Sequence, residues 1–277
     1  MKPDGLRFVS AATVSLEAYA AAINAAFEGY PVRVAFTAPM MARRIRFEQH
    51  ELECSLIALE GEEVVGMAGL AVRGGRGWVS GFGVVPARRG RGLGGRLMSE
   101  LVSRARAYGL RRLSLDVLTE NVAAIRLYEG AGMRITRDQL VLERPADYPP
   151  KAAGRAPREA PAEELLTHYW RLHPVRPAWQ RELPALLAAD LRGLYVGGRA
   201  RPRAYALLGR GRTDGNIYIS DLAAAEAAGA EEMCAALGRT GGLLKIINEP
   251  ASGPYAAPLL AHGFVETLRQ HEMTMEL

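Results

Sequence analysis

The stretch that organises the sequence joins a strand to a helix, and it reads Val84-Val-Pro-Ala-Arg-Arg-Gly-Arg-Gly-Leu-Gly-Gly-Arg96. The apolar run at residues 78–85 predicts a β-strand before it. After it, apolar residues recur at Leu97, Leu101 and Ala105, which is the spacing of a helix with one buried face. A strand that leads through a glycine-rich turn into an amphipathic helix indicates a protein of the α/β (α+β) class.

The chemistry of this turn suits a phosphate-bearing ligand. The first turn of a helix has unpaired N–H groups and the positive end of the helix dipole. Glycines let a ligand approach that backbone, and arginines add charge-assisted donors. The stretch therefore predicts a polyphosphate-cofactor loop, in which Arg88 and Arg96 are equally consistent with phosphate contacts and with solvated charge.

Length and composition limit the other possibilities. A chain of 277 residues is long enough for two domains. Its 35 basic and 30 acidic residues give a net charge of +5, too small an excess to predict a nucleic-acid partner. The two cysteines, Cys54 and Cys234, are expected to be buried thiols, and no metal-ligand spacing is present. Without an apolar run of about 18 residues or a leader-like start, we expect a cytoplasmic protein with no membrane partner.

The pattern of elements occurs twice. The first copy is predicted to contain helices at 15–28, 38–49 and 121–130, a hairpin at 55–72, and strands at 112–118 and 133–142. In the second copy, helices at 162–171 and 178–189 precede strands at 194–196, 204–208, 216–222 and 243–247 and near 272–277. Without gaps, Gly132-Met133 aligns with Gly263-Phe264, so two copies of one α/β unit are predicted.

We predict three segments: a catalytic domain at 1–147, a linker rich in Pro and Ala at 148–161, and a degenerate copy at 162–277. The segment of the second copy that aligns with the glycine loop, Leu222–Met233, has one glycine, no arginine and three glutamates. It is expected to repel phosphate, so only the first copy should bind the cofactor.

A competing motif overlaps the loop. Gly90, Gly92 and Gly95 fit G-x-G-x-x-G, and Asp116 follows at a distance that suits a dinucleotide site. A dinucleotide-binding oxidoreductase using NAD is therefore one alternative. Against it, the acidic residue of such a site ends its strand, whereas Val117 and Leu118 continue this one.

The sequence resembles the GNAT family, the GCN5-related N-acetyltransferases, through two linked motifs within residues 78–135. The first is the acetyl-CoA signature Q/R-x-x-G-x-G/A, here Arg89-Gly-Arg-Gly-Leu-Gly94. The second runs from Leu115-Asp-Val through Asn121, Ala124 and Leu127-Tyr128 to Gly132-Met133. The resemblance implies two tandem GNAT-like units, each a mixed, mostly antiparallel sheet flanked by helices, with a degenerate second copy.

The resemblance also implies a cofactor, acetyl-CoA, and a set of residues that bind it. The main chain of Phe82, Gly83 and Val84 would pair with the pantetheine arm, and Asn121 would hydrogen-bond that arm. The pyrophosphate would be bound by the loop itself, formed by Arg89, Gly90, Arg91, Gly92, Leu93, Gly94 and Gly95.

Tyr128 is implied as the general acid that protonates the departing CoA thiolate. A phenol with a pKa of about 10 is a plausible donor to a thiolate whose conjugate acid has a pKa near 8.5. Many members of the family have a glutamate on the strand before the loop, but that strand has no acidic residue here. Some protein N-terminal acetyltransferases of the family have a glutamate at the position of Asp116, so the resemblance implies Asp116 as the candidate base. The other interpretation is a solvated strand residue, or one paired with Arg112 or Arg126.

The predicted reaction is direct acetyl transfer from acetyl-CoA to an amine in a ternary complex, because no candidate nucleophile suggests a covalent intermediate. The acceptor is open: polyamines, aminoglycosides, amino acids and protein N-termini all fit. A non-catalytic acyl-CoA-binding sensor is the other alternative.

Overall fold

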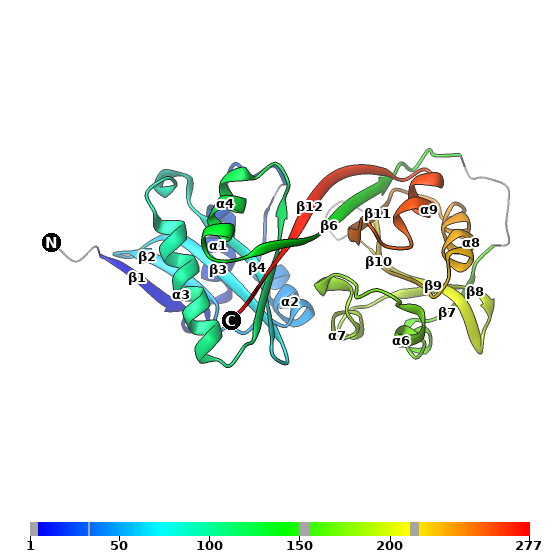
Figure 1. The fold of residues 1–277 in the computed structure, drawn as a ribbon, viewed down its shortest axis with the longest axis horizontal. Helices are drawn as coiled ribbons and strands as arrows, with labels where there is room; N and C mark the ends of the chain where they lie inside the picture. The colour runs from blue at the N-terminus through cyan, green and yellow to red at the C-terminus, as the bar shows by residue number, and fades with distance from the viewer. Residues whose placement is uncertain (1–4, 33, 150–155, 211–215) are drawn as a thin grey trace. The chain divides into compact units, whose positions relative to one another are not determined.

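The computed structural model describes residues 5–32, 34–149, 156–210 and 216–277 (Figure 1). The chain forms two compact units: unit 1 comprises Met1–Thr136 and Glu272–Leu277, and unit 2 comprises Arg137–His271. These boundaries differ from the domains expected from sequence in two ways: unit 2 begins at Arg137, inside the expected catalytic domain, and the last residues of the chain belong to unit 1. Within the expected linker, residues 150–155 lie outside the described residues, and Arg158–Pro161 is a strand, β7.

The sheet of unit 1 has the strand order β1-β2-β3-β4-β5-β12. Neighbours from β1 to β4 are antiparallel, whereas β4 and β5 are parallel. The strands are β1 (Leu6–Ser10), β2 (Leu56–Glu60), β3 (Glu63–Arg73), β4 (Arg76–Val84), β5 (Arg112–Leu118) and the C-terminal part of β12 (Val265–Glu276).

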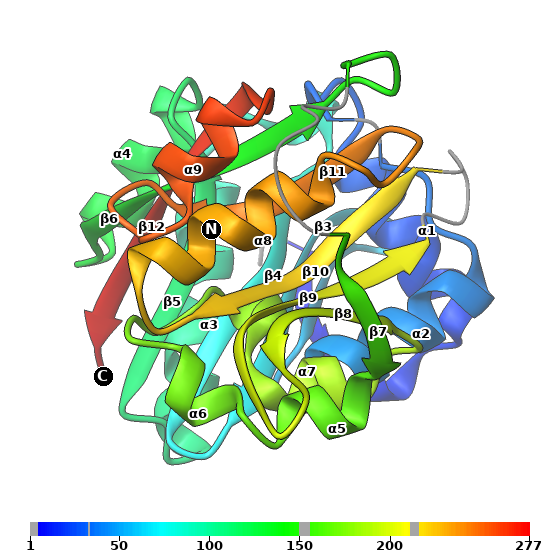
Figure 2. The same cartoon turned by 90° about the vertical axis from the view of Figure 1, so that its right-hand side faces the viewer.

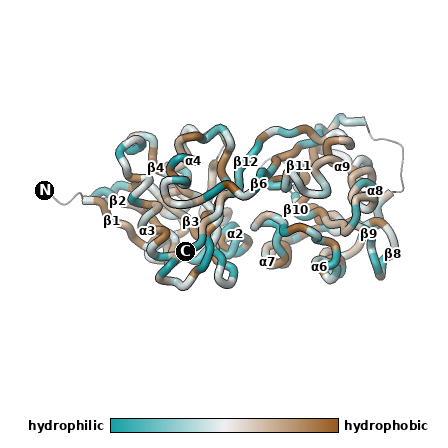
Figure 3. The backbone as a smooth tube through the Cα atoms, in the orientation of Figure 1, coloured by the Kyte–Doolittle hydropathy of each residue, from teal (hydrophilic) through white to brown (hydrophobic). Residues whose placement is uncertain are grey.

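Four helices cover this sheet: α1 (Leu16–Ala26), α2 (Ala38–Glu48), α3 (Leu93–Ala107) and α4 (Val122–Gly130). Residues of α3 and α4 pack with one face in a core that includes Leu97, Leu101 and Tyr128. Residues of α1 and α2 pack with the other face in a core that includes Tyr19 and Met41. Single elements change between hydrophobic and hydrophilic colours along their length, as expected when one side is buried (Figure 3).

Unit 2 repeats this arrangement with the strand order β7-β8-β9-β10-β11-β6 (Figure 2). The strands other than β7 are β6 (Arg134–Arg144), β8 (Arg192–Gly198), β9 (Arg201–Arg210), β10 (Ile217–Ala224) and β11 (Leu244–Pro250). The helices are α5 (Ala162–Leu166), α6 (Tyr169–Leu172), α7 (Leu183–Leu187), α8 (Ala227–Leu237) and α9 (Ala256–Ala261). Among the described strand pairs of this unit, β10 and β11 alone are parallel, like β4 and β5 in unit 1.

The predicted repeat is confirmed in detail. A β-bulge places Ser80 between two paired residues of β4, and another places Ser220 in the same way in β10. Gly132 after α4 and Gly263 after α9 both have a left-handed backbone, with φ of 94° and 87°. Each sheet is completed by a strand that follows the last helix of the other unit: β12 lies beside β5, and β6 lies beside β11.

The main differences from the expected elements lie in unit 2. Instead of two long helices, the chain forms the short α5, α6 and α7 and a 3-10 turn at Trp179–Arg181. Pro184 lies inside the second expected helix and occupies the first turn of α7, where proline needs no helical donor and therefore favours a new helix start. The break between α5 and α6, at Thr167 and His168, contains no proline. No helix of the described ranges is long and apolar enough to span a bilayer.

Candidate functional site

The backbone of β4 has an unpaired edge at the end of the strand. The parallel ladder joins Arg76–Val79 only to Arg112–Leu115, and the bulge at Ser80 follows at once. The N–H of Val85 donates to Val65 O on β3 at 3.1 Å, so the N–H of Val84, one residue earlier, points to the other side. We call the β5-facing backbone of Phe82–Val84 the open edge. Among the described residues no ladder pair continues along it. The Val84 carbonyl accepts from Arg89 Nε at 2.9 Å, and the Val84 N–H remains available to an extended, amide-containing ligand.

The glycine loop follows directly and presents donors to solvent. Gly90 and Gly92 have φ of 73° and 77°, a left-handed backbone that glycine adopts without strain. No side chain caps the first turn of α3, whose orphan N–H groups come from Gly92 to Gly95. A Cβ on Gly95 would meet no atom within 4 Å, whereas a Cβ on Gly94 would lie 2.6 Å from Leu127. The loop thus combines accessible donors with the positive end of a long helix, as an anion site requires.

The arginines of the loop have different surroundings. Arg88 donates to Glu60 at 2.8 Å and to Glu63 at 3.4 Å, which favours the interpretation of this side chain as an ion-paired surface residue. The guanidinium of Arg89 donates to three main-chain carbonyls, a contact considered below. Arg91 is exposed and remains a candidate phosphate contact.

Tyr128 lies in the core between α4 and the sheet, beside the open edge. Its ring meets that of Phe82 edge to face, with 5.8 Å between the centroids. Burial raises the pKa of Tyr128 well above its usual value, and the nearby Tyr30 adds to the rise. The phenol therefore keeps its proton at neutral pH, and no described residue hydrogen-bonds its hydroxyl group.

Asn121 and Asp116 both lie near the point where β4 and β5 separate. The side-chain oxygen of Asn121 accepts from Ala124 N at 3.3 Å and caps α4, so its amide N–H₂ group remains for a ligand. Asp116 is the first residue of β5 beyond the ladder, and it accepts from the indole N–H of Trp78 at 3.1 Å.

The two candidate proton-transfer groups lie on opposite faces of the sheet. Leu115 and Val117 belong to the same core as Tyr128, and side chains alternate along a strand, so Asp116 faces the other side. This arrangement suits a reaction in which an amine loses a proton on one side of a thioester and the thiolate gains one on the other.

A buried polar network on the α1 and α2 face was not foreseen from sequence. His50 contacts Glu48 at 2.8 Å and the Tyr19 hydroxyl at 3.4 Å, and Arg44 contacts Glu48 at 2.9 Å. Burial alone would raise the pKa of Glu48, but Arg44 and His50 outweigh it and lower the pKa. Arg44 and Glu48 lie four residues apart on α2, and His50 follows soon after, so their spacing is a signal that could have indicated this ion pair. Tyr19 comes from α1, and no sequence spacing links it to the other three residues.

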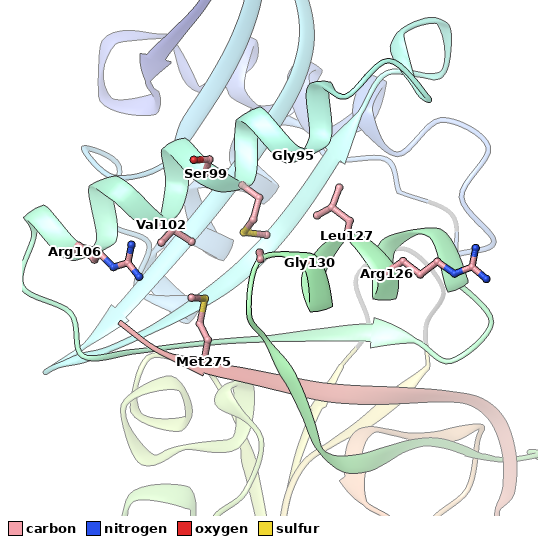
Figure 4. A pocket seen from close by; sticks show the side chains of 10 residues that line it. Gly95, Ser99, Val102, Arg106, Arg126, Leu127, Gly130 and Met275 are labelled. Atoms are coloured by element: carbon pink, nitrogen blue, oxygen red, sulfur yellow. The ribbon is translucent and has the colours of Figure 1, made fainter.

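A surface pocket continues from the glycine loop between α3 and α4 (Figure 4). It has a volume of about 590 Å³, and its lining includes Gly95, Ser99 and Arg106 from α3, Leu127 from α4 and Met275 from β12. Figure 4 shows the Met275 side chain reaching towards α3. Among the described residues no group of three His, Cys, Asp or Glu side chains is placed to hold a metal ion.

In unit 2 the equivalent edge is filled by side chains. Counting from the bulges, Ala224 corresponds to Val84, and its N–H donates to the Tyr255 hydroxyl at 2.7 Å. Arg181 donates to the carbonyl of Leu222 at 3.2 Å and pairs with Glu249 and Asp221. Burial would lower the pKa of Arg181, but the two carboxylates raise it, so the cation persists. A ligand would have to displace these groups to pair with β10.

Comparisons with known proteins agree with this architecture. Residues 19–133 match the model described as the Acetyltransferase (GNAT) family. Mycothiol acetyltransferases from two strains of Corynebacterium glutamicum are 28% identical over 158 residues, which is 51% of this chain and 51% of each relative. The chain thus spans about half the length of the curated relatives it matches.

Two solved structures share the fold along nearly the whole chain. A GCN5-related N-acetyltransferase from Sphaerobacter thermophilus has a TM-score of 0.69 at 16% identity, covering 100% of this chain and 97% of its own. A tandem GNAT protein from the clavulanic acid biosynthesis pathway has a TM-score of 0.69 at 18% identity, covering 98% of both chains. Residues 19–133 thus match the GNAT family model, and the chain as a whole has two units of one fold in series, the fold that it shares with the tandem GNAT structure.

Proposed function

We propose that unit 1 is an N-acetyltransferase that moves an acetyl group from acetyl-CoA to an amine. The observation that carries the proposal is the continuity of the open edge with the glycine loop: unpaired main-chain groups for the pantetheine lead directly to uncapped N–H groups for the pyrophosphate. The family match supports acetyl-CoA as the donor.

In this mechanism the residues of the chain bind and orient the two substrates and move protons. The main chain of Phe82–Val84 and the Asn121 amide hold the pantetheine arm, and the loop from Arg89 to Gly95 holds the phosphates. Asp116 accepts the amine proton, directly or through water, while Tyr128 supplies a proton to the sulfur as the C–S bond breaks. A C–N bond forms, the C–S bond breaks, and no covalent enzyme intermediate is needed. The second proton that the nitrogen loses passes through solvent to the Tyr128 phenolate, and Asp116 releases its proton to solvent, so both residues return to their starting states.

A proton acceptor is needed for a quantitative reason. An alkylamine with a pKa of about 10 is only about 0.1% neutral at pH 7, which corresponds to roughly 4 kcal/mol. Asp116 lies where β4 and β5 separate, and an amine on the α1 and α2 face of the sheet would reach it there.

Calorimetric titration tests the cofactor site. The wild-type chain should bind acetyl-CoA, and NAD should produce no comparable heat. Gly94→Glu places a carboxylate against the pyrophosphate and a side chain against Leu127, so affinity should fall at least tenfold, or about 1.4 kcal/mol. A folded Gly94→Glu variant with unchanged affinity would remove the loop from the site.

Activity is tested by following free CoA release with a panel of polyamines, aminoglycosides, amino acids and peptides with free N-termini. An amine-dependent release that depends on Tyr128 supports the enzyme. Tight acetyl-CoA binding with no release for any amine class would favour the acyl-CoA sensor.

A further inference from the structure

Arg89 connects the glycine loop to the end of helix α1. Its Nε donates to Val84 O at 2.9 Å, and a terminal nitrogen donates to Ala26 O at 3.1 Å and Glu28 O at 2.9 Å. The last carbonyls of a helix lack helical partners and carry the negative end of the dipole, so a cation there is stabilising. Arg89 therefore caps α1 from the loop, more than 60 residues further along the chain.

The segment that follows α1 faces the candidate site. The N–H of Tyr30 donates to Phe27 O at 3.0 Å, and the two rings meet edge to face with centroids 5.2 Å apart. A Cβ on Gly83 would lie 2.9 Å from Ala26 O, so the end of α1 sits directly on the open edge. Tyr30 is also close enough to influence the ionisation of Tyr128. We call Phe27–Tyr30 the wall segment.

We propose that Arg89 is a positioning latch, which holds the wall segment against the open edge. Because of this contact, the wall segment becomes ordered together with the glycine loop when an anionic cofactor binds. The consequence for the cofactor rests on the proposed function, because it takes acetyl-CoA as the ligand of the loop. The Nε and one terminal nitrogen of Arg89 already donate to carbonyls of the protein, so the side chain shapes the site. Because coupling between two sites is reciprocal, cofactor binding should protect the wall segment, and a loosened wall should weaken cofactor binding.

Substitutions of Arg89 and Arg91 separate the effect of the contacts with α1 from the effect of positive charge in the loop. Arg89→Gln and Arg91→Gln each remove one positive charge from the same loop, but only the first removes contacts with α1. Arg89→Lys keeps the charge and loses the planar group that bridges three carbonyls. The Arg89 side chain is on the surface, so these variants should fold, and thermal unfolding of each checks this directly.

The experiment is hydrogen–deuterium exchange of peptides that cover the wall segment, with and without acetyl-CoA, together with calorimetric affinity for acetyl-CoA. In the wild type, acetyl-CoA should slow exchange in both the loop and the wall segment. In Arg89→Gln and Arg89→Lys, the wall segment should exchange faster without ligand and gain little protection at saturation, and affinity should fall roughly three- to tenfold. In Arg91→Gln, affinity should fall with the lost charge while exchange of the wall segment stays as in the wild type.

Unchanged wall-segment exchange in both Arg89 variants would overturn the latch. Retention of wild-type behaviour by Arg89→Lys alone would also overturn it, since charge would then be sufficient. The exchange rates of the wall segment in the wild type and in the Arg89 variants, compared without ligand, test the latch independently of cofactor binding. If the wild type did not bind acetyl-CoA, the ligand-free exchange rates would still support or overturn the latch, and only the proposed function would fail.

Discussion

Replacing Tyr128 by phenylalanine separates its acid role from its packing role. The phenylalanine keeps the edge-to-face contact with Phe82, and no described residue loses a hydrogen-bond partner. Stability should therefore change by no more than about 0.5 kcal/mol, as for substitutions that leave packing intact. Burial holds the pKa of Tyr128 above its usual value, so nearly every molecule has the acid form at neutral pH. Loss of a general acid typically costs 10²–10⁴-fold in kcat, or about 3–5 kcal/mol.

The assay is the initial rate of CoA release with an accepted amine, together with a pre-steady-state measurement that verifies chemistry as the slow step. Affinity for acetyl-CoA should remain nearly intact, which distinguishes a lost proton donor from a damaged binding site. Tyr108→Phe is the matched control: it removes the hydroxyl of an exposed tyrosine that bonds Glu51, and kcat should not change. If Tyr128→Phe keeps more than about a third of wild-type kcat, the thiolate leaves without this acid, and Tyr128 is a packing residue.

Three further predictions concern stoichiometry, pH and stability. Because side chains occupy the edge of β10, calorimetry should give one acetyl-CoA per chain, and two equivalent sites would contradict our interpretation of unit 2. Because the pKa of Tyr128 is raised above about 10, the acid form is present throughout the neutral and moderately alkaline range. The rate of acetyl transfer should then rise with pH as the amine deprotonates. A fall in this rate that begins below pH 9 in the wild type and is absent in Tyr128→Phe would contradict the prediction. Arg181→Leu leaves two buried carboxylates without their cation and should cost about 3–5 kcal/mol in denaturant unfolding. Arg192→Leu, which breaks only an exposed pair with Glu159, should cost at most about 1 kcal/mol, and equal losses would refute the argument.

Much of the fold was predictable because its signals are local. Ser15 accepts from Ala18 N as the predicted cap of α1. Gly109, with a φ of 88°, follows the end of α3 at the predicted place. The strand–loop–helix around Gly90–Gly95 occurs where the periodicity placed it. Edge strand β1 was missed because five residues carry too little pattern to be distinguished from a loop.

What could not be predicted depends on contacts between distant residues. A loop arginine is expected to contact phosphate on grounds of charge, but nothing local indicates that Arg89 reaches carbonyls at the end of α1. The same holds for β12, whose pattern predicts a strand but not which sheet it completes. Pairing is decided by long-range geometry, and the chain places Glu272–Leu277 in unit 1.

The two units together explain why we expect one cofactor site, in unit 1, among the residues that the structure describes. Both separate their parallel strands after a bulge, and the separation leaves main-chain groups that need partners. An unsatisfied buried donor or acceptor costs about 1–3 kcal/mol. In unit 2, Tyr255 and Arg181 provide partners from within the protein, so the fold is satisfied without a ligand. In unit 1, the aromatic rings of Phe82 and Tyr128 lie beside the open edge. Among the described residues, however, no hydroxyl group accepts a hydrogen bond from the Val84 N–H, as Tyr255 does from Ala224 in unit 2. The same backbone is therefore a closed structural element in one unit and an open edge, available to the proposed ligand, in the other, and the difference lies in a few side chains.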